Sequence, residues 1–485
     1  MFQQFVVGGS SGPVAMAPLR IHAGLGDTPT VDWLRIVWPD AVLQGEMEMA
    51  ADCVTAVEEI PRKASSCPYL FAFNGEQFEF IADFGGVGGL GYLVSPGQYA
   101  PPDPTEYLPI PRLEPLDGQY VLQALTPLEE VTYFDEAKLV AVDHPAGTEV
   151  VPYEMMAIGV PPPPFEVFCF ERPIEPVRAL DEQGRDVTEL VRQVDRRYAG
   201  ATRPDPRFLG LADEHRVELD FADRLQSLPP GARLILVLNG WVEYGYSQTN
   251  FAASQAGLQT RAPTIEVQRD GQWVALVREV GYPAGVNHVM TVDLTGQLQS
   301  SDRCLRVTSN MELYWDRIFL AQHLAQASVK LAEVAASSAD LHFRGYPREF
   351  SPDGRHPNLC DYNNLDRSAG WKLMSGDYTR FGEVAELLEA DDDCYVIMGH
   401  GEELTLRFAA DAFGPVPEDC RRSFLLKTDS YCKDMDLYTA FPDTLEPLPF
   451  HGMSGYPYGP DERYPDTPKT REYRERFNTR TIRTR

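Results

Sequence analysis

The stretch "YLFAFNGEQFEFIADF" (residues 69–84) decides the fold class. Its Asn74-Gly75 pair stands between two runs that are rich in aromatic residues. Asn and Gly both accept positive φ angles, which the two-residue turn of a β-hairpin requires. The stretch therefore predicts two antiparallel strands joined by a tight turn.

The same hairpin chemistry recurs along the chain. Asp117-Gly118 and Asp270-Gly271 also stand between β-like runs. Further short apolar runs, such as "CYVIMG" (394–399), are separated by turn residues at the spacing typical of β-sandwiches. The 40 prolines and 38 glycines among 485 residues disfavour long helices. We predict a mainly β protein built of several antiparallel β-sandwich or jelly-roll domains, with few short helices.

Helical periodicity is confined to short segments. Residues 186–198 ("DVTELVRQVDRRY") and 381–392 ("FGEVAELLEADD") place apolar side chains on one helical face. Both are therefore predicted to be short helices. Residues 323–343 ("HLAQASVKLAEVAASSADLHF") are compatible with a helix or with strands.

Proline-rich and polar stretches suggest the domain boundaries. A chain of 485 residues exceeds what one hydrophobic core usually serves. "EEIPRKASSCP" (58–68) separates a first segment, and "IGVPPPPFEVF" (158–168) is typical of a stiff linker. The predicted units are a partial β domain (1–62), a β domain with the hairpin and a glycine-rich turn (63–160), a galactose-binding-like sandwich (166–325), a second sandwich (326–450) and an extended basic tail (451–485).

The charge of the chain limits its partners. The formal net charge is −29, and such a field repels phosphate backbones, so we expect no nucleic-acid partner. The basic tail could dock on its own acidic body or on a neighbouring subunit, or it could be solvated. No apolar run is long enough to predict a transmembrane helix, and residues 1–13 lack the pattern of a signal peptide.

Residues 83–93 ("DFGGVGGLGYL") contain a G-x-G-x-x-G pattern from Gly86 to Gly91. A phosphate cradle of this type needs a helix directly after it. The next residues, "YLVSPGQYAPPDP" (92–104), carry too many prolines for a helix. We therefore expect no nucleotide cofactor, and we interpret the segment as a glycine turn that packs closely against another backbone.

A sugar-binding site is one hypothesis for the stretch "LNGWVEYGYSQTNFAASQAG" (238–257). Aromatic rings can stack on sugar C–H faces, and amides can recognise hydroxyl groups. The alternative is that the rings fill the core of the sandwich. The candidate ligand-binding residues are Trp241, Tyr244, Tyr246, Gln248 and Asn250.

Structural Ca²⁺ is a second hypothesis, because closely spaced carboxylates can converge on a hard cation. The alternative is that these residues close turns without a metal. The candidate ligands lie in "KDMDLYT" and "CDYNNLDRS" and are Asp434, Asp436 and Thr439, together with Asp361, Asn363 and Asp366.

Nucleophilic catalysis finds no support in the sequence. The nine histidines are dispersed and form no H-E-x-x-H motif. His400 with Glu402 and Glu403 could coordinate a metal or shuttle protons, or could form a hairpin tip. We assign no catalytic residue, and whether the chain is an enzyme stays open, with the balance against it.

The N-terminal segment carries a family resemblance. "IHAGLGDTPTVDWLRIVWPD" (21–40) combines a G-L-G turn, an apolar strand and Trp-Pro-Asp. It resembles the ASPIC/UnbV domain, although Ala41 replaces the usual glycine. Later stretches, including "YAPPDPTEYLPIP" (99–111) and "EEVTYFDEAKLVAVDHP" (129–145), resemble the C-terminal extension of some bacterial ASPIC/UnbV proteins.

The resemblance implies a role rather than a reaction. In such proteins the domain usually follows an FG-GAP β-propeller and is often exported. We therefore expect a non-catalytic binding or assembly protein, located in the periplasm or at the cell surface, with a propeller chain or another subunit as its partner. The alternatives are a carbohydrate-binding module that recognises a glycan, and an enzyme or enzyme subunit without a recognisable site.

Overall fold

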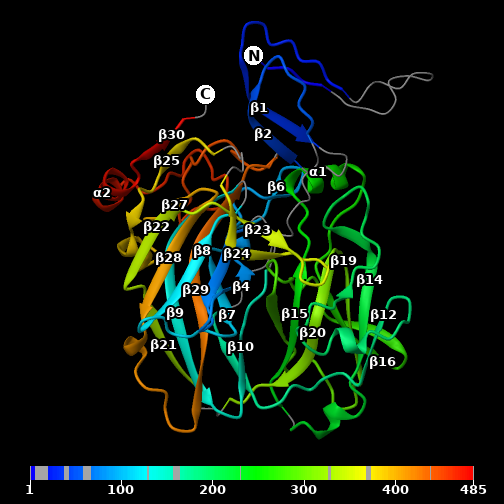
Figure 1. The fold of residues 1–485 in the computed structure, drawn as a ribbon. Helices are drawn as coiled ribbons and strands as arrows, with labels where there is room; N and C mark the ends of the chain where they lie inside the picture. Colours follow the sequence, from blue (N-terminus) through cyan, green and yellow to red (C-terminus); the bar gives the residue numbers. More distant parts are fainter. Residues whose placement is uncertain are drawn as a thin grey trace, which may run out of the picture.

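The computed structural model describes residues 2–5, 20–37, 43–57, 67–127, 130–156, 164–229, 231–325, 329–367, 373–436 and 438–483. The described chain is mainly β, as predicted, and its strands form multiple antiparallel sheets. Two β-sandwiches lie side by side, and the N-terminal hairpin of β1 (Thr30–Val37) and β2 (Leu43–Ala50) stands above them (Figure 1). Trp38-Pro39-Asp40 and residues 58–66 and 157–163, which include most of the expected linkers, lie outside the described residues.

The first sandwich combines early and late parts of the chain. One of its sheets has the order β21-β9-β29-β7, with β27 also paired to β9. These strands are β7 (Thr105–Ile110), β9 (Glu130–Pro145), β21 (Lys330–Ala335), β27 (Val396–Met398) and β29 (Cys420–Asp434). The other sheet has the order β26-β22-β28-β8-β3-β4. Its strands are β3 (Tyr69–Phe73), β4 (Phe78–Asp83), β8 (Gln119–Leu125), β22 (Ser338–Phe343), β26 (Gly382–Glu383) and β28 (Glu402–Ala409).

The second sandwich lies within the range predicted for a galactose-binding-like domain. One sheet has the order β12-β14-β19-β16-β17 and the other β13-β20-β15-β18. The strands are β12 (Arg178–Asp181), β13 (Ala199–Gly200), β14 (Leu211–Asp220), β15 (Leu234–Val242), β16 (Thr264–Arg269), β17 (Gln272–Val277), β18 (His288–Asp293), β19 (Cys304–Met311) and β20 (Leu313–Gln322). Its core includes Trp315 and Leu236 from one sheet and Leu305 from the other.

The pairing of distant strands changes the domain picture. In the first sandwich, β8 pairs with β28 and β9 pairs with β29 along most of their length. Residues 63–160 and 326–450 therefore share both sheets of the first sandwich. The second sandwich is inserted in the chain between these two ranges and lies beside the first (Figure 1). Pairing partners that lie hundreds of residues apart leave no local pattern in the sequence.

The predicted hairpins form, but one turn differs. Asp117-Gly118 and Asp270-Gly271 make two-residue turns with positive φ at both residues. In contrast, Phe73 pairs with Phe78, so the loop after β3 has four residues. The Asn74 side chain accepts hydrogen bonds from the backbone N–H groups of Glu76 and Gln77, both at 3.0 Å. Asn74 therefore closes this turn through its side chain.

The predicted helix at 186–198 is wrong. The segment has only a 3₁₀ turn at Thr188–Leu190, because its backbone bonds to the neighbouring strand β20: the N–H of Ile318 donates to the carbonyl oxygen of Val191 at 2.9 Å. Val194, placed on the apolar face, is 61 % exposed. The segment 381–392 likewise has only a 3₁₀ turn, Ala385–Leu388, and 323–343 contributes β21 and β22.

Two α-helices lie among the described residues, in places where none was predicted. α1 (Ser247–Gln255) occupies the aromatic and amide-rich stretch. α2 (Pro468–Phe477) and strand β30 (Arg480–Ile482) occupy the tail that was expected to be extended. Thr467 and Thr470 form a capping box at the start of α2. No described helix is long and apolar enough to cross a membrane.

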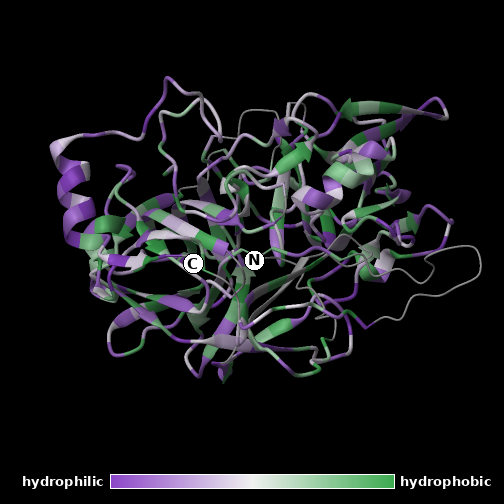
Figure 2. Cartoon of the chain, turned by 90° about the horizontal axis from the view of Figure 1, so that it is seen from above, coloured by the Kyte–Doolittle hydropathy of each residue, from purple (hydrophilic) through white to green (hydrophobic). Residues whose placement is uncertain are grey.

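The basic tail docks on its own chain. β30 pairs with β25 (Gly376–Tyr378), and Tyr473 and Phe477 of α2 are buried in the core of the first sandwich. The other residues of α2 are mostly hydrophilic (Figure 2). Arg480 reaches both carboxylate oxygens of the buried Glu402, at 2.6 and 2.9 Å. The tail was predicted to dock on its own chain, to dock on a neighbouring subunit, or to be solvated. The structure shows the first of these arrangements.

Candidate ligand-binding site at the junction of the two sandwiches

The glycine-rich segment lies where the two sandwiches meet. Strand β5 (Leu93–Ser95) follows it directly, so the chain does not continue from the loop into an α-helix as a phosphate cradle requires. On one side, a Cβ added to Gly88 would lie 2.2 Å from the carbonyl oxygen of Ser430 in β29. On the other, a Cβ on Gly86 would lie 3.0 Å from the Tyr244 hydroxyl of the second sandwich. The segment is thus the close-packed turn that the sequence predicted.

A small cavity of about 70 Å³ opens beside this turn, and we call it the junction cavity. Both sandwiches contribute to its walls. Its tyrosine rings come from Tyr92, Tyr244 and Tyr246. Its other functional groups are the carboxyl groups of Asp103, Glu130 and Asp434 and the thiols of Cys67 and Cys432. A cavity of this size holds a few water molecules or a small ion but no larger ligand.

Burial keeps the Cys432 thiol and the Tyr92 hydroxyl of the junction cavity protonated at neutral pH. Burial, with the nearby Glu130 carboxylate, raises the pKa of Cys432 well above its usual value. Burial also raises the pKa of Tyr92, and the carboxylates of Asp434 and Asp436 add to the effect. Burial raises the pKa of Asp103 to about 6. The Cys432 thiol is therefore not an activated nucleophile at neutral pH.

Two of the predicted candidate groups converge here. Asn250 of α1 donates hydrogen bonds to the Tyr92 hydroxyl and the Leu93 carbonyl oxygen, both at 2.9 Å. Thr439 donates to Asp434 at 2.6 Å, and its oxygen lies 3.0 Å from the Ser247 hydroxyl of α1. The 241–250 stretch and the D-x-D motif were predicted to be two separate sites. The structure places parts of both around the glycine turn.

Of the other predicted ligand-binding residues, Trp241 and Gln248 lie elsewhere. Trp241 is 4 % exposed and stacks on Tyr314, with ring centroids 4.4 Å apart, so it belongs to the packed interior. Gln248 is buried and lines neither this cavity nor the groove described below. Tyr244 and Tyr246 line the junction cavity, but burial of Tyr246 leaves little of its ring accessible.

Among the predicted calcium ligands, Asp434 and Asp361 accept local hydrogen bonds. One carboxylate oxygen of Asp434 accepts hydrogen bonds from the Asp436 backbone N–H and the Thr439 hydroxyl. Asp361 of β24 (Leu359–Asp366) accepts from the backbone N–H of Asn363 at 3.0 Å. Asp366 lies at the opposite end of that strand. These contacts fit the alternative reading, in which such residues close turns without a metal.

One group of potential metal ligands in the described chain was not singled out from the sequence. Asp135, Asp393 and His451 lie within reach of a shared ion. The two ring nitrogens of His451 lie 2.8 Å from Asp393 and 2.9 Å from Asp429. Despite burial, these carboxylates raise the pKa of His451 to about 10. The protonated imidazole thus already supplies the positive charge that the carboxylates need.

A larger groove of about 370 Å³ lies next to the junction cavity, and we call it the aromatic groove. Its walls come from strands β5 and β6 (Gln98–Tyr99), helix α1 and the loop that follows β29. The lining residues are Leu93, Gly97, Tyr99, Phe251, Tyr438, Thr439, Ala440, Phe441 and Pro457. α1 and β6 lie near the upper end of the junction in Figure 1.

The loop at the groove holds two aromatic residues in an unusual conformation. Tyr438 and Phe441 have φ angles of 85° and 54°, and they are 45 % and 47 % exposed. Such angles are rare for bulky residues, and each costs about 1–3 kcal/mol. Gly91 allows this loop to approach, because a Cβ there would lie 2.5 Å from that of Ala440. These residues were not predicted as ligand-binding residues, because their only signal in the sequence was the aromatic content of a turn-like segment.

A buried ionic cluster joins the sandwiches below the glycine turn. His288 of β18 lies 3.1 Å from a carboxylate oxygen of Asp83 and 3.6 Å from one of Glu106. The backbone N–H of Gly85 donates to the other Glu106 oxygen at 2.7 Å. Burial raises the pKa of Glu106 to about 7. Burial by itself would lower the pKa of His288, but the carboxylates of Asp83 and Glu106 raise this pKa to about 9.

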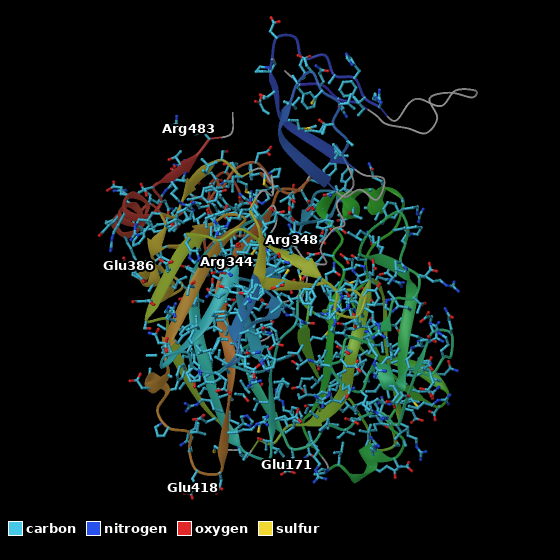
Figure 3. The ribbon with its side chains drawn as sticks, in the orientation of Figure 1. Glu171, Arg344, Arg348, Glu386, Glu418 and Arg483 are labelled. Carbon is cyan, nitrogen blue, oxygen red and sulfur yellow. The ribbon has the colours of Figure 1, made fainter. Side chains whose placement is uncertain are left out.

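The His400 motif is a structural ion-pair network. Glu402 is held by Arg480, and Glu403 lies 3.2 Å from Arg344, which Figure 3 labels. His400 lies 2.6 Å from the Tyr346 hydroxyl. The two carboxylates of the motif therefore pair with arginines that anchor neighbouring segments.

Comparison with known proteins adds no relative, since no family model matches the chain and no curated protein or solved structure is significantly similar to it.

Proposed function

We propose that this protein is a non-catalytic binding protein and that its ligand occupies the aromatic groove. The observation that carries the proposal is the loop of Tyr438 and Phe441, which holds exposed rings at positive φ angles around a concave surface. Strained, exposed side chains of this kind persist where a ligand uses them, since the fold alone gains little from them.

The surroundings of the groove support binding rather than catalysis. Ser247, Thr439 and Asn250 tie helix α1 to the loop and to β5 through hydrogen bonds, so the groove is assembled before any ligand arrives. Preformed sites bind without paying for loop ordering. The neighbouring Cys432 thiol is protonated at neutral pH, so it is not an activated nucleophile. Assembly with a propeller chain, glycan binding, structural calcium and a periplasmic or surface location stay predictions.

The test is a ligand screen with matched variants. A diverse library of small molecules is screened by ligand-observed NMR against the parent protein, Phe441→Ala and Phe350→Ala. Phe350 is the control, because it is 46 % exposed in β23 (Tyr346–Phe350) and lies outside the groove. We expect hits that bind the parent and the control alike and bind Phe441→Ala at least tenfold more weakly, since a lost aromatic contact removes about 1–2 kcal/mol. Hits that bind Phe441→Ala as well as the parent would place the ligand elsewhere.

A further inference from the structure

We propose that the aromatic groove recognises the ammonium group of an organic cation, an inference that rests on the groove being the ligand site. The first argument is the chemistry of its walls. Four of the nine lining residues, Tyr99, Phe251, Tyr438 and Phe441, are aromatic, and no described lining residue is charged. Aromatic faces attract ammonium groups through the ring quadrupole, and alkylated ammonium ions pack well within such walls.

The second argument is the shortage of free hydrogen-bonding groups. Apart from the tyrosine hydroxyls, the only polar side chain in the lining is Thr439. Its hydroxyl donates to Asp434, and the remaining side of its oxygen faces the hydroxyl of Ser247, which accepts from the Leu93 N–H. A sugar needs several donors and acceptors to read its hydroxyls. The groove supplies few of them, whereas an alkylated ammonium group requires none.

The third argument is charge. Thr439 lines the groove, and its hydroxyl group donates a hydrogen bond to the carboxylate of Asp434 at 2.6 Å. This carboxylate therefore lies directly behind the groove wall. The buried Asp436 carboxylate follows two residues later, and both influence the neighbouring Tyr92. The whole chain carries a formal net charge of −29. This field attracts cations toward the groove and opposes anionic ligands.

The fourth argument is the rigidity of the rings. Phe251 and Tyr438 stack nearly parallel, with centroids 4.3 Å apart and an angle of 9° between the ring planes. Phe441 makes an edge contact with Tyr456 at 6.4 Å. Tyr438 and Phe441 of the loop are thus each held in place by a second aromatic residue. Rings that are already fixed lose little entropy when a cation binds against their free faces.

The experiment compares a cation with a neutral molecule of the same shape. Choline and its uncharged isostere 3,3-dimethyl-1-butanol are titrated separately into the full chain by isothermal titration calorimetry. We expect choline to bind at least tenfold more tightly than the isostere. Equal affinities, or binding of the isostere alone, would overturn the ammonium proposal.

Two kinds of variant locate the binding. Tyr438→Phe keeps the ring and should keep choline binding, whereas Tyr438→Leu and Phe441→Leu remove a ring and should weaken it at least tenfold. Phe350→Leu is the matched control outside the groove and should bind like the parent. Melting curves of each variant confirm that it is folded. Choline binding that is unchanged in both groove leucine variants would also overturn the proposal.

The outcome separates this inference from the proposed function. If the screen finds a neutral sugar or another uncharged ligand whose binding depends on Phe441, the groove is a ligand site and the ammonium proposal fails. If no ligand depends on Phe441, the proposed function itself fails. Choline binding that depends on the rings supports both.

Discussion

Gly88 shows how single residues set the junction between the sandwiches. Its Cα faces the backbone of β29, and a side chain there would overlap the carbonyl oxygen of Ser430. The parallel bridge between Gly89 and Cys432 and the hydrogen bond from the Leu90 N–H to the Cys432 carbonyl oxygen, at 2.7 Å, depend on this approach. The glycine pattern that resembles a phosphate loop is thus a packing requirement.

At the residue scale we predict that Gly88→Ala destabilises the protein by about 1–3 kcal/mol, since the new methyl group forces the glycine turn away from β29. Gly147→Ala is the control, because a Cβ there has no neighbour within 4 Å. Urea unfolding of both variants measures the effect. Equal unfolding midpoints for Gly88→Ala and the parent would show that the turn can move without loss.

At the scale of elements, the C-terminal helix and strand depend on two kinds of contact. Tyr473 and Phe477 anchor α2 through burial in the first sandwich. Arg480 anchors β30 through two hydrogen bonds to Glu402, whose exposure is only 4 %. Arg476 of α2 forms an ion pair with Glu386, which Figure 3 labels, and both side chains are about half exposed. Solvent screening makes such an exposed pair contribute little.

We therefore predict that Arg480→Ala destabilises the protein by about 3 kcal/mol, because it leaves the buried Glu402 carboxylate without its cation. Arg476→Ala should change stability by less than about 0.5 kcal/mol. The unfolding midpoints of the two variants give the comparison. Adding Glu402→Gln to Arg480→Ala should recover much of the loss, and a failure to recover would argue against an electrostatic cause.

At the scale of the whole molecule, the two sandwiches are joined by a buried ionic cluster. Asp83 and Glu106 come from the first sandwich and His288 from the second. Glu154 also lies nearby, and burial raises its pKa well above the usual value, with Glu106 adding to the effect. The junction thus holds more carboxyl groups than cations, and some of them remain protonated in the folded state.

This cluster predicts a loss of stability as the pH rises. Glu106 has a folded-state pKa of about 7, against 4.5 for the usual group. Its contribution is fully present below pH 4.5 and is lost as the pH rises through about 7, since the folded protein holds a proton that the unfolded chain releases. The contribution amounts to about 3 kcal/mol at most.

Glu106→Gln should remove this part of the pH dependence. Urea midpoints measured from pH 4.5 to 8 are expected to fall with pH more steeply in the parent than in the variant. Glu114→Gln changes an exposed glutamate and should follow the parent. Parallel pH profiles for the parent and Glu106→Gln would contradict the assignment.

Part of the candidate site could be predicted from the sequence. Asn250, Asp434 and Thr439 were chosen for their chemistry, and all three contribute to the network around the groove. The rings of Tyr438 and Phe441 could not be found this way, because aromatic residues rarely adopt positive φ and nothing local marks the exceptions. The exposure of a ring depends on its neighbours, which is why Trp241 was assigned to a site although it is buried.

The β character and the hairpin turns follow from local sequence, because alternation of side chains and the φ preferences of Asn, Asp and Gly act over a few residues. The glycine segment is also predictable as a tight turn, because the prolines after it exclude a helix. The pairing of β9 with β29, and the insertion of the second sandwich in the chain between these two strands, are visible in the folded structure alone. The groove at their junction exists because segments far apart in the chain meet there, and that meeting is set by long-range pairing and burial rather than by local preference.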